Sequence, residues 1–242
     1  MDLECIGRVD AIRQQLSDAA SERWGRAPEI IAVSKTVPAQ RVNEVKYAGI
    51  TRLGENRVQE ALEKLPYLDS SFQIDLIGQL QLNKVKYIID KVAMIQSLDR
   101  EPLAQEIDRR AQQHGLCMPV LIQVNIGNEP QKGGIAVGDL LPFARLAASL
   151  PGLSVRGLMA VMPNLPDEAA LRPYFVQMRQ LFETLRDAAI GGTQVEELSM
   201  GMSGDYLLAA QEGATHVRIG SAIFGRRAAA VPRDLNLKGE KA

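Results

Sequence analysis

The chain has 242 residues, 46% of them hydrophobic and 24% charged, so it is long and apolar enough to bury one full core. Its 28 basic and 29 acidic residues leave a formal net charge of -1, which argues against a charge-driven surface for nucleic acid or an anionic membrane. The two cysteines form no CxxC motif, and no apolar run approaches the roughly 20 residues of a membrane span. We therefore expect a soluble cytoplasmic protein without disulfides.

The first predicted element is a helix over Asp2–Trp24, which Pro28 ends. Apolar side chains recur there at helical spacing, from Ile6 to Ala20. Eight short apolar runs come after it along the chain. They are Glu29–Ser34, Arg52–Gly54, Ile74–Ile77, Met94–Ser97, Val120–Asn125, Ser154–Val161, Glu197–Met200 and His216–Gly220. Several are continuous rather than alternating in hydrophobicity, which is typical of parallel strands covered on both faces. Cys117 precedes the fifth run, and we expect its thiol to be buried.

Helical stretches separate these runs, and many of them end in a glycine, as left-handed helix caps do. They are Pro38–Tyr47, Val58–Leu65, Gln81–Asp90, Glu101–His114, Val137–Leu150, Leu171–Ala189 and Asp205–Gln211. The alternation predicts an α/β fold, a single (β/α)8 TIM barrel with an N-terminal helix, with a doubly wound open sheet as the alternative. We expect one domain over residues 1–227 and a polar tail over 228–242.

In such a barrel the functional groups lie at the C-terminal ends of the strands. The first strand ends in Ser34-Lys35-Thr36, so we expect the amine of Lys35 at the barrel mouth. Burial there would lower the pKa of Lys35, and a neutral amine can form a Schiff base with a carbonyl group. The alternative is a lysine whose long side chain simply reaches solvent.

Polar groups also follow the second and third strands. Glu55 and Asn56 come after the second, and the amide-rich segment 79–83 comes after the third. Common turns and helix N-caps explain these residues as well as a site does.

A stronger signal follows the last two strands, where glycines accompany Ser203 and Ser221 and let backbone N–H groups approach an anion. Because phosphate commonly sits at these loops in (β/α)8 barrels, we predict a phosphate site there, with plain turn chemistry as the alternative.

Two charged residues stand inside predicted strands. Arg218 is costly to bury unless it meets an acceptor, so it should face a ligand or pair with a carboxylate such as Glu55. Asp75 could be a catalytic acid, although such residues are more often paired or point outward. The sequence has no Cys/His cluster with metal spacing, no nucleophile elbow and no Walker A or GxGxxG loop, and we expect no metal.

Six ordered blocks together resemble the pyridoxal-phosphate homeostasis protein family, over about residues 5 to 227. They are AVSKT (32–36), GENRVQE (54–60), IGQLQLNK (77–84), GLMA (157–160), LSMGMS (198–203) and VRIGSAIFG (217–225). The resemblance implies a barrel like the N-terminal domain of alanine racemase, without that enzyme's second, β-rich domain. Lys35 then matches the lysine that holds pyridoxal 5′-phosphate covalently as a Schiff base. Asn56 matches a residue that lines the cofactor. The phosphate-binding positions are matched by Ser203, Gly220 and Ser221, with the backbone around Met202.

By the same resemblance, Arg218 matches an arginine that faces the pyridine nitrogen. A guanidinium keeps its proton, so it leaves that nitrogen unprotonated and makes the cofactor a weaker electron sink. One departure is Asp75, because family members usually carry histidine at that position, and any histidine-dependent role there is in doubt. Ser221 replaces a threonine of many members and keeps the hydroxyl.

The resemblance implies a binding protein with no catalytic residues, not an enzyme. It would hold pyridoxal 5′-phosphate, limit the free aldehyde, and serve homeostasis of vitamin B6 and of amino and keto acids, with apo-enzymes as recipients of the cofactor. An amino-acid racemase is the alternative, yet alanine racemase draws its second base from the missing domain, and only Tyr206 is a weak candidate here. A third interpretation is a sugar-phosphate enzyme that works through Lys35. We expect a monomer, because no exposed apolar heptad stands out.

Overall fold

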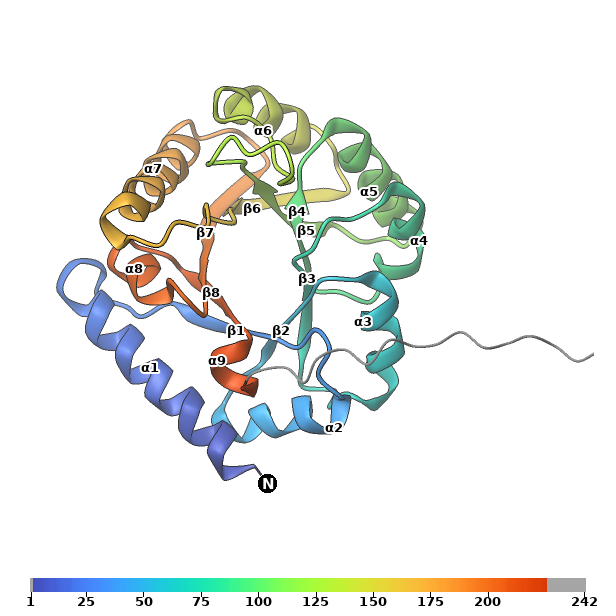
Figure 1. Ribbon diagram of the computed structural model, residues 1–242. Helices are drawn as coiled ribbons and strands as arrows, with labels where there is room; N and C mark the ends of the chain where they lie inside the picture. Colours follow the sequence, from blue (N-terminus) through green and yellow to red (C-terminus); the bar gives the residue numbers. More distant parts are fainter. Residues whose placement is uncertain (1, 226–242) are drawn as a thin grey trace, which may run out of the picture.

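The computed structural model describes residues 2–225, which form a closed barrel of eight parallel strands in the order β1 to β8 (Figure 1). The strands are β1 (Glu29–Val33), β2 (Arg52–Glu55), β3 (Gln73–Leu76), β4 (Met94–Leu98), β5 (Met118–Gln123), β6 (Leu153–Met159), β7 (Thr193–Met202) and β8 (His216–Ile219). Each overlaps one predicted apolar run, so the barrel is confirmed and the open sheet is wrong. The predicted tail, 228–242, lies outside the described residues.

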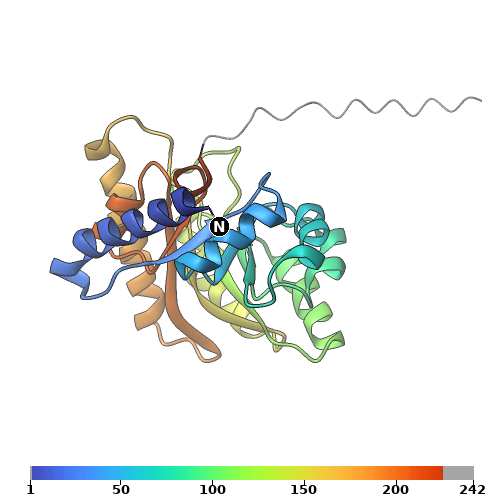
Figure 2. The same ribbon diagram turned by 90° about the horizontal axis from the view of Figure 1, so that it is seen from below.

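Helices surround the barrel on its outer side (Figures 1 and 2). The α-helices are α1 (Leu3–Trp24), α2 (Ala39–Val42), α3 (Val58–Lys64), α4 (Val85–Ile88), α5 (Glu101–Gln113), α6 (Leu140–Ala148), α7 (Glu168–Asp187), α8 (Tyr206–Gln211) and α9 (Ser221–Phe224). The 3₁₀ helices are η1 (Asn43–Ala48), η2 (Leu65–Tyr67), η3 (Leu82–Lys84) and η4 (Val137–Asp139). The segments predicted as single helices over Pro38–Tyr47, Gln81–Asp90 and Val137–Leu150 each divide into a 3₁₀ part and an α part.

The N-terminal helix α1 is held at both ends. The carboxylate of Asp2 accepts the Cys5 N–H at 2.9 Å, and Gly25 ends the helix in the left-handed conformation (φ 69°), before Pro28 is reached. Its apolar face, which includes the fully buried Val9 and Leu16, packs toward the barrel beside α8. The helix thereby covers the β8 and β1 side of the barrel (Figure 1).

The barrel interior has an apolar part and a polar part. Met94, Leu121 and Met159, from β4, β5 and β6, form a small apolar cluster separate from the main core. The Sδ atom of Met94 lies 3.5 Å from Nη2 of Arg52, so the polar part begins directly beside it. Buried side chains of that part, including Asp75 and others from β4, β7 and β8, reach from the lower end of the barrel to its mouth.

The expectation that the Cys117 thiol is buried is wrong, because Cys117 is exposed and Cys5 is the buried cysteine. Cys117 lies directly before β5, and burial begins one residue later, at Met118 (3% exposed). The apolar pattern therefore located the strand correctly, while Cys117, the residue before it, is exposed to solvent. Every helix within residues 2–225 is too short or too polar to cross a lipid bilayer.

Candidate functional site at the barrel mouth

A cavity of about 250 Å³ opens at the C-terminal ends of β1, β2, β7 and β8. It is lined by Val33, Lys35, Asn56, Ile77, Val161, Met202, Ser203, Gly204, Arg218, Gly220 and Ser221. All seven residues that the sequence singled out for cofactor binding are in this lining. Chain segments far apart in the sequence thus meet at the end of the barrel where active sites of this architecture lie.

Lys35 stands in a tight turn that ends β1. The Val37 N–H donates to the Ser34 carbonyl at 2.9 Å, which closes the turn around Lys35 and Thr36. Thr36 has a φ of 64°, a left-handed conformation that is strained for a β-branched residue and costs on the order of 1–3 kcal/mol. Such strain persists only where neighbouring groups hold it, so the position of Lys35 is fixed by more than its own strand.

Helix α3 holds this turn from behind. The carboxylate of Glu60 accepts the Thr36 N–H. The ammonium of Lys64 donates to the Ser34 carbonyl at 2.5 Å and to Glu55 Oε1 and Glu60 Oε1, each at 2.7 Å. Burial raises the pKa of Glu55, and hydrogen bonds from Lys64 and Ser34 act in the opposite direction. Glu60 and Lys64 were not predicted as site residues, and their only signal in the sequence is the i,i+4 spacing of opposite charges.

Asn56 brings unused hydrogen-bonding capacity to the cavity. Its Oδ1 atom is buried and has no hydrogen-bond partner among the described residues. Gly78, after β3, packs against the backbone of Asn56 so closely that a Cβ at position 78 would lie 2.1 Å from the Asn56 carbonyl oxygen. A buried polar atom without a partner is costly, which points to a ligand as the missing partner.

Two loops converge at the other end of the cavity. The N–H groups of Gly220 and Ala222 lie 3.2 and 3.4 Å from Oγ of Ser203 and donate to it. The Met202 N–H donates to Oδ1 of Asp205 at 2.5 Å, so this predicted anion donor is engaged within its own turn. Ser203 and the two N–H groups therefore supply hydrogen-bond donors at this end of the cavity, which is the arrangement that an anion would require.

Arg218 forms part of the cavity wall from β8 and is 4% exposed. Its Nη1 donates to Ser199 Oγ and its Nη2 to the Ala160 carbonyl, both at 2.7 Å. The expected alternative partner, Glu55, is bound instead to Ser34 and Lys64 on the outer side of β2. Burial lowers the pKa of Arg218 to about 10, and nearby Asp205 acts in the opposite direction, so the guanidinium stays charged at neutral pH.

Tyr206, the candidate for a second base, is turned away from this cavity. Its hydroxyl donates to Oε1 of Gln15 in α1 at 2.5 Å, and burial raises its pKa. The ionisable side chains that line the cavity, within the described residues, are those of Lys35 and Arg218. A group for proton transfer from the opposite face of a bound ligand is therefore not among the lining residues.

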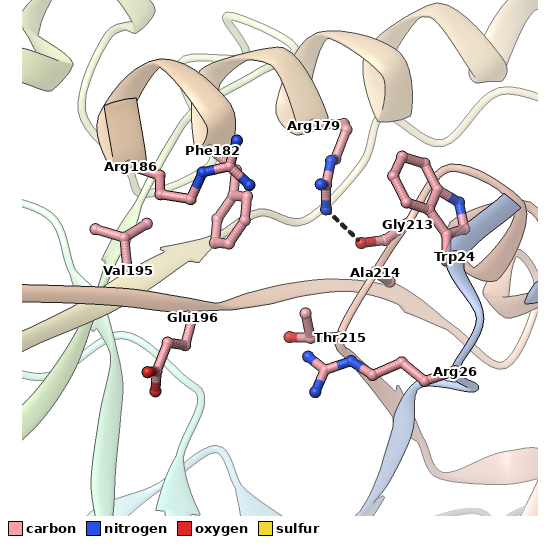
Figure 3. Close-up of a pocket in the computed structure, with 10 residues that line it drawn as sticks. All are labelled: Trp24, Arg26, Arg179, Phe182, Arg186, Val195, Glu196, Gly213, Ala214 and Thr215. Carbon is pink, nitrogen blue, oxygen red and sulfur yellow. Dashed lines mark hydrogen bonds between the residues drawn. The ribbon is translucent and has the colours of Figure 1, made fainter. Parts of the chain in front are cut away.

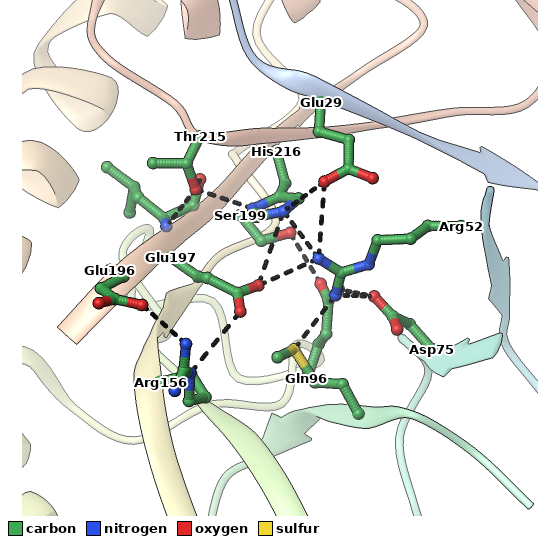
Figure 4. Close-up of polar contacts among 12 residues, drawn as sticks. Glu29, Arg52, Asp75, Gln96, Arg156, Glu196, Glu197, Ser199, Thr215 and His216 are labelled. Carbon is green, nitrogen blue, oxygen red and sulfur yellow. Dashed lines mark hydrogen bonds and ion pairs between the residues drawn. The ribbon is translucent and has the colours of Figure 1, made fainter. Parts of the chain in front are cut away.

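The lower end of the barrel carries a second charged cluster, shown in Figure 4. Nη2 of Arg52 donates to Asp75 Oδ2 at 2.6 Å, and Nη1 donates to Glu197 at 3.2 Å and lies 2.8 Å from His216 Nε2. Glu29 lies 3.3 Å from the same His216 nitrogen. Asp75 is fully buried, so it neither points outward nor reaches the mouth cavity. Within the described residues, no group of three His, Cys, Asp or Glu side chains is placed to hold a metal ion.

A larger cavity, of about 460 Å³, lies outside the barrel beside α7 (Figure 3). Arg179 is central to it, with its guanidinium 4.3 Å from the Trp24 ring and 5.2 Å from the Phe182 ring. The same guanidinium donates to the Gly213 carbonyl at 3.3 Å. These contacts already engage Arg179, and no lysine is among the residues that line this cavity. The mouth cavity is therefore the better candidate for a functional site.

Comparison with known proteins identifies relatives along nearly the whole chain. The family described as "Alanine racemase, N-terminal domain" matches residues 8–228. The pyridoxal phosphate homeostasis protein of Aquifex aeolicus is 42% identical over 224 residues, which are 91% of this chain and 97% of the relative. The protein of the same name from Escherichia coli K12 is 35% identical over 89% of this chain and 94% of its own length.

Solved structures agree with this assignment. PipY of Synechococcus elongatus, in a structure with pyridoxal phosphate bound, superimposes with a TM-score of 0.80 at 33% identity, over 91% of this chain and all of that one (100%). Alanine racemase of Clostridium difficile has a TM-score of 0.71 at 13% identity and shares only the fold. The match covers 93% of this chain and 58% of the racemase.

Proposed function

This chain belongs to the alanine racemase N-terminal domain family and, within it, to the pyridoxal phosphate homeostasis proteins. We propose that it binds pyridoxal 5′-phosphate at the barrel mouth, covalently on Lys35. The observation that carries the proposal is the convergence of Lys35, Asn56, Arg218 and the loop around Ser203 on one cavity. These residues supply an amine, an amide, a guanidinium and an anion site, which match the functional groups of this cofactor.

The cofactor, when bound, supplies an aldehyde that forms a Schiff base with an amine. Lys35 is the amine-bearing residue of the cavity, and the braced turn fixes the place of its side chain. Asn56 would use its unpaired Oδ1 as a hydrogen-bond acceptor beside the ring. Oγ of Ser203 occupies the place where two backbone N–H groups converge, and rotation of this hydroxyl would leave both donors, with Ser221 nearby, to the phosphate.

Arg218 supports a binding role over a catalytic one. The guanidinium stays protonated although it is buried in the cavity wall. It would therefore donate a hydrogen bond to the pyridine nitrogen, and that nitrogen would stay unprotonated. An unprotonated ring withdraws electrons less strongly. Together with the position of Tyr206 outside the cavity, this favours a non-catalytic carrier over the racemase alternative. We further propose that the protein acts in the cytoplasm as a monomer and releases the cofactor to apo-enzymes.

The absorbance spectrum of the purified protein with added pyridoxal 5′-phosphate tests this proposal. We expect a band of covalently bound cofactor in the wild type and in Lys86→Ala, a matched control at a lysine outside the cavity. Lys35→Ala should lose the band completely and keep the circular dichroism of the folded barrel. A band that survives in Lys35→Ala would exclude Lys35 as the attachment site. A sugar-phosphate enzyme, the third interpretation, would give no such band in the wild type.

A further inference from the structure

A continuous row of buried side chains connects the mouth cavity to the charged cluster beneath it. Nη1 of Arg218 donates to Ser199 Oγ at 2.7 Å, and that hydroxyl donates to Gln96 Oε1 at 2.7 Å. Nε2 of Gln96 then donates to Asp75 Oδ2 at 2.6 Å. Arg52 donates to the same carboxylate oxygen at 2.6 Å, and Figure 4 shows this lower part of the row.

All three hydrogen bonds between Arg218 and Asp75 run in the same direction. A carboxylate only accepts, so Asp75 fixes the amide of Gln96 with its NH₂ group downward and its oxygen toward Ser199. That oxygen in turn takes the hydroxyl proton of Ser199 and leaves a lone pair for Arg218. If the lower end could donate, Gln96 could flip and turn its NH₂ group toward Ser199, whose hydroxyl proton would then lose its acceptor. Hydrogen bonds in such a row also strengthen one another inside a protein.

We propose that Asp75 is a positioning residue for Arg218, acting through Gln96 and Ser199 to hold the guanidinium in the cavity wall where the ligand's ring nitrogen is bound. The inference rests on the proposed cofactor site and adds to it a residue that does not line the cavity. Asp75 is fully buried beneath the mouth, and its effect is carried by hydrogen bonds, not by contact with the ligand.

The charge state of Asp75 determines the strength of the hydrogen bonds at the lower end of the row. Burial raises the pKa of Asp75 to about 6, and the neighbouring Arg52 and Gln96 only partly offset this rise. Arg52 on β2 and Gln96 on β4 are the polar groups in contact with it, and His216 on β8 is a weaker favourable charge. Glu197 and Glu29 face the other side of Arg52. At neutral pH the carboxylate is ionised, and below about pH 6 the row loses its anionic end.

The test compares cofactor affinity in the wild type, in Asp75→Asn and in a matched control, Glu29→Gln. Glu29 is a half-exposed carboxylate that also lies near Arg52, at 3.9 Å, but stands outside the row. We expect Asp75→Asn to bind pyridoxal 5′-phosphate about tenfold more weakly at pH 7.5, as for one charge-assisted hydrogen bond lost. Glu29→Gln should stay within about twofold of the wild type, because it leaves every bond of the row in place.

The pH profile separates positioning from a general loss of structure. The wild type should lose affinity relative to Asp75→Asn as the pH falls from 7.5 to 5, because only the wild type loses a carboxylate there. Titration of the cofactor phosphate is common to both proteins and cancels in the ratio. A ratio that stays constant over this range would overturn the proposal.

Ser199→Ala provides a second variant, which breaks the row at its middle without adding volume. If Asp75 acts through Ser199, the double variant Asp75→Asn/Ser199→Ala should bind no more weakly than the poorer single variant. Additive losses would mean that Asp75 acts by another route and would overturn the inference. A wild type that shows no cofactor binding would instead contradict the proposed function, so the two failures are distinguishable.

Discussion

The two ends of the barrel interior differ in whether their buried polar groups have a charged partner within the protein. At the mouth, Asn56 keeps an unpaired buried oxygen and Thr36 keeps a strained backbone beside Lys35. At the lower end, the guanidinium of Arg52 contacts Asp75, Glu197 and His216 (Figure 4). The unpaired oxygen at the mouth therefore belongs to a neutral side chain that lines a cavity. At the lower end, Arg52 Nε and Asp75 Oδ1 also lack a hydrogen-bond partner, but they belong to two groups whose charges pair with each other.

This difference predicts opposite results for mutations at the two ends. Changes at the lower end should act mainly on the free energy of unfolding, because charges buried there depend on one another. Changes at the mouth should act mainly on ligand affinity, because the groups there line the cavity in which the ligand would bind. The row through Ser199 and Gln96 is the connection that would let one lower-end residue influence the mouth.

The largest effect is expected for Arg52→Met. The substitution leaves Asp75 buried without its cation, and breaking a buried pair in this way costs roughly 3–5 kcal/mol of unfolding free energy. Denaturant unfolding at pH 7.5 measures this loss. Arg156→Met is the matched control on the same end of the barrel. Arg156 pairs with the exposed Glu196 at 2.7 Å and lies 3.9 Å from Glu197, so its loss should stay below about 1 kcal/mol.

The double variant Arg52→Met/Asp75→Asn sharpens this test, since removing the buried carboxylate should recover much of the lost stability. Equal losses for Arg52→Met and Arg156→Met would mean that the lower-end cluster is not the stabilising element described above.

A smaller effect, on affinity more than on stability, is expected for Gly78→Ala. The new Cβ would lie 2.1 Å from the Asn56 carbonyl oxygen, so the backbone that presents Asn56 must shift. We expect pyridoxal 5′-phosphate to bind about tenfold more weakly, measured by absorbance titration. Gly138→Ala is the control, because a Cβ at Gly138 has no neighbour within 4 Å. Unchanged affinity in Gly78→Ala would remove Asn56 from the proposed site.

The smallest effect is expected for modification of Cys117. This exposed thiol lines a cavity of about 420 Å³ at the lower end, together with Arg52 and Arg156. A maleimide should label Cys117 and leave the buried Cys5 unmodified in the native protein, as peptide mass mapping would show. The labelled protein should bind the cofactor within about twofold of the unlabelled one. A large loss of affinity would show that the two ends are more strongly coupled than the single row allows.

The fold and most of the candidate site could be predicted because their signals are local in the sequence. Buried parallel strands appear as apolar runs, and the glycine-rich loops with Ser203 and Ser221 mark an anion site. The place of Lys35 followed from its position at the end of β1. These features require no knowledge of which strands face each other across the barrel.

The lower-end cluster could not be predicted, because it depends on the register between strands. Arg52, Asp75, Glu197 and His216 come from four strands and meet only in the closed barrel. Strand alternation also explains why the pairing of Arg218 with Glu55 was wrong. Arg52 and Glu55 are three positions apart in β2, so their side chains point to opposite faces, and Glu55 meets Lys64 outside the barrel.

The proposed bond between Lys35 and the cofactor can be examined by mapping the site of covalent attachment. The wild-type protein is loaded with pyridoxal 5′-phosphate, reduced with borohydride, digested and mapped by mass spectrometry. The account predicts the reduced cofactor on the peptide that contains Lys35, with Lys64, which lies behind the same turn, unmodified. Attachment to another lysine, or no attachment to the folded protein, would contradict the assignment of the barrel mouth as the cofactor site.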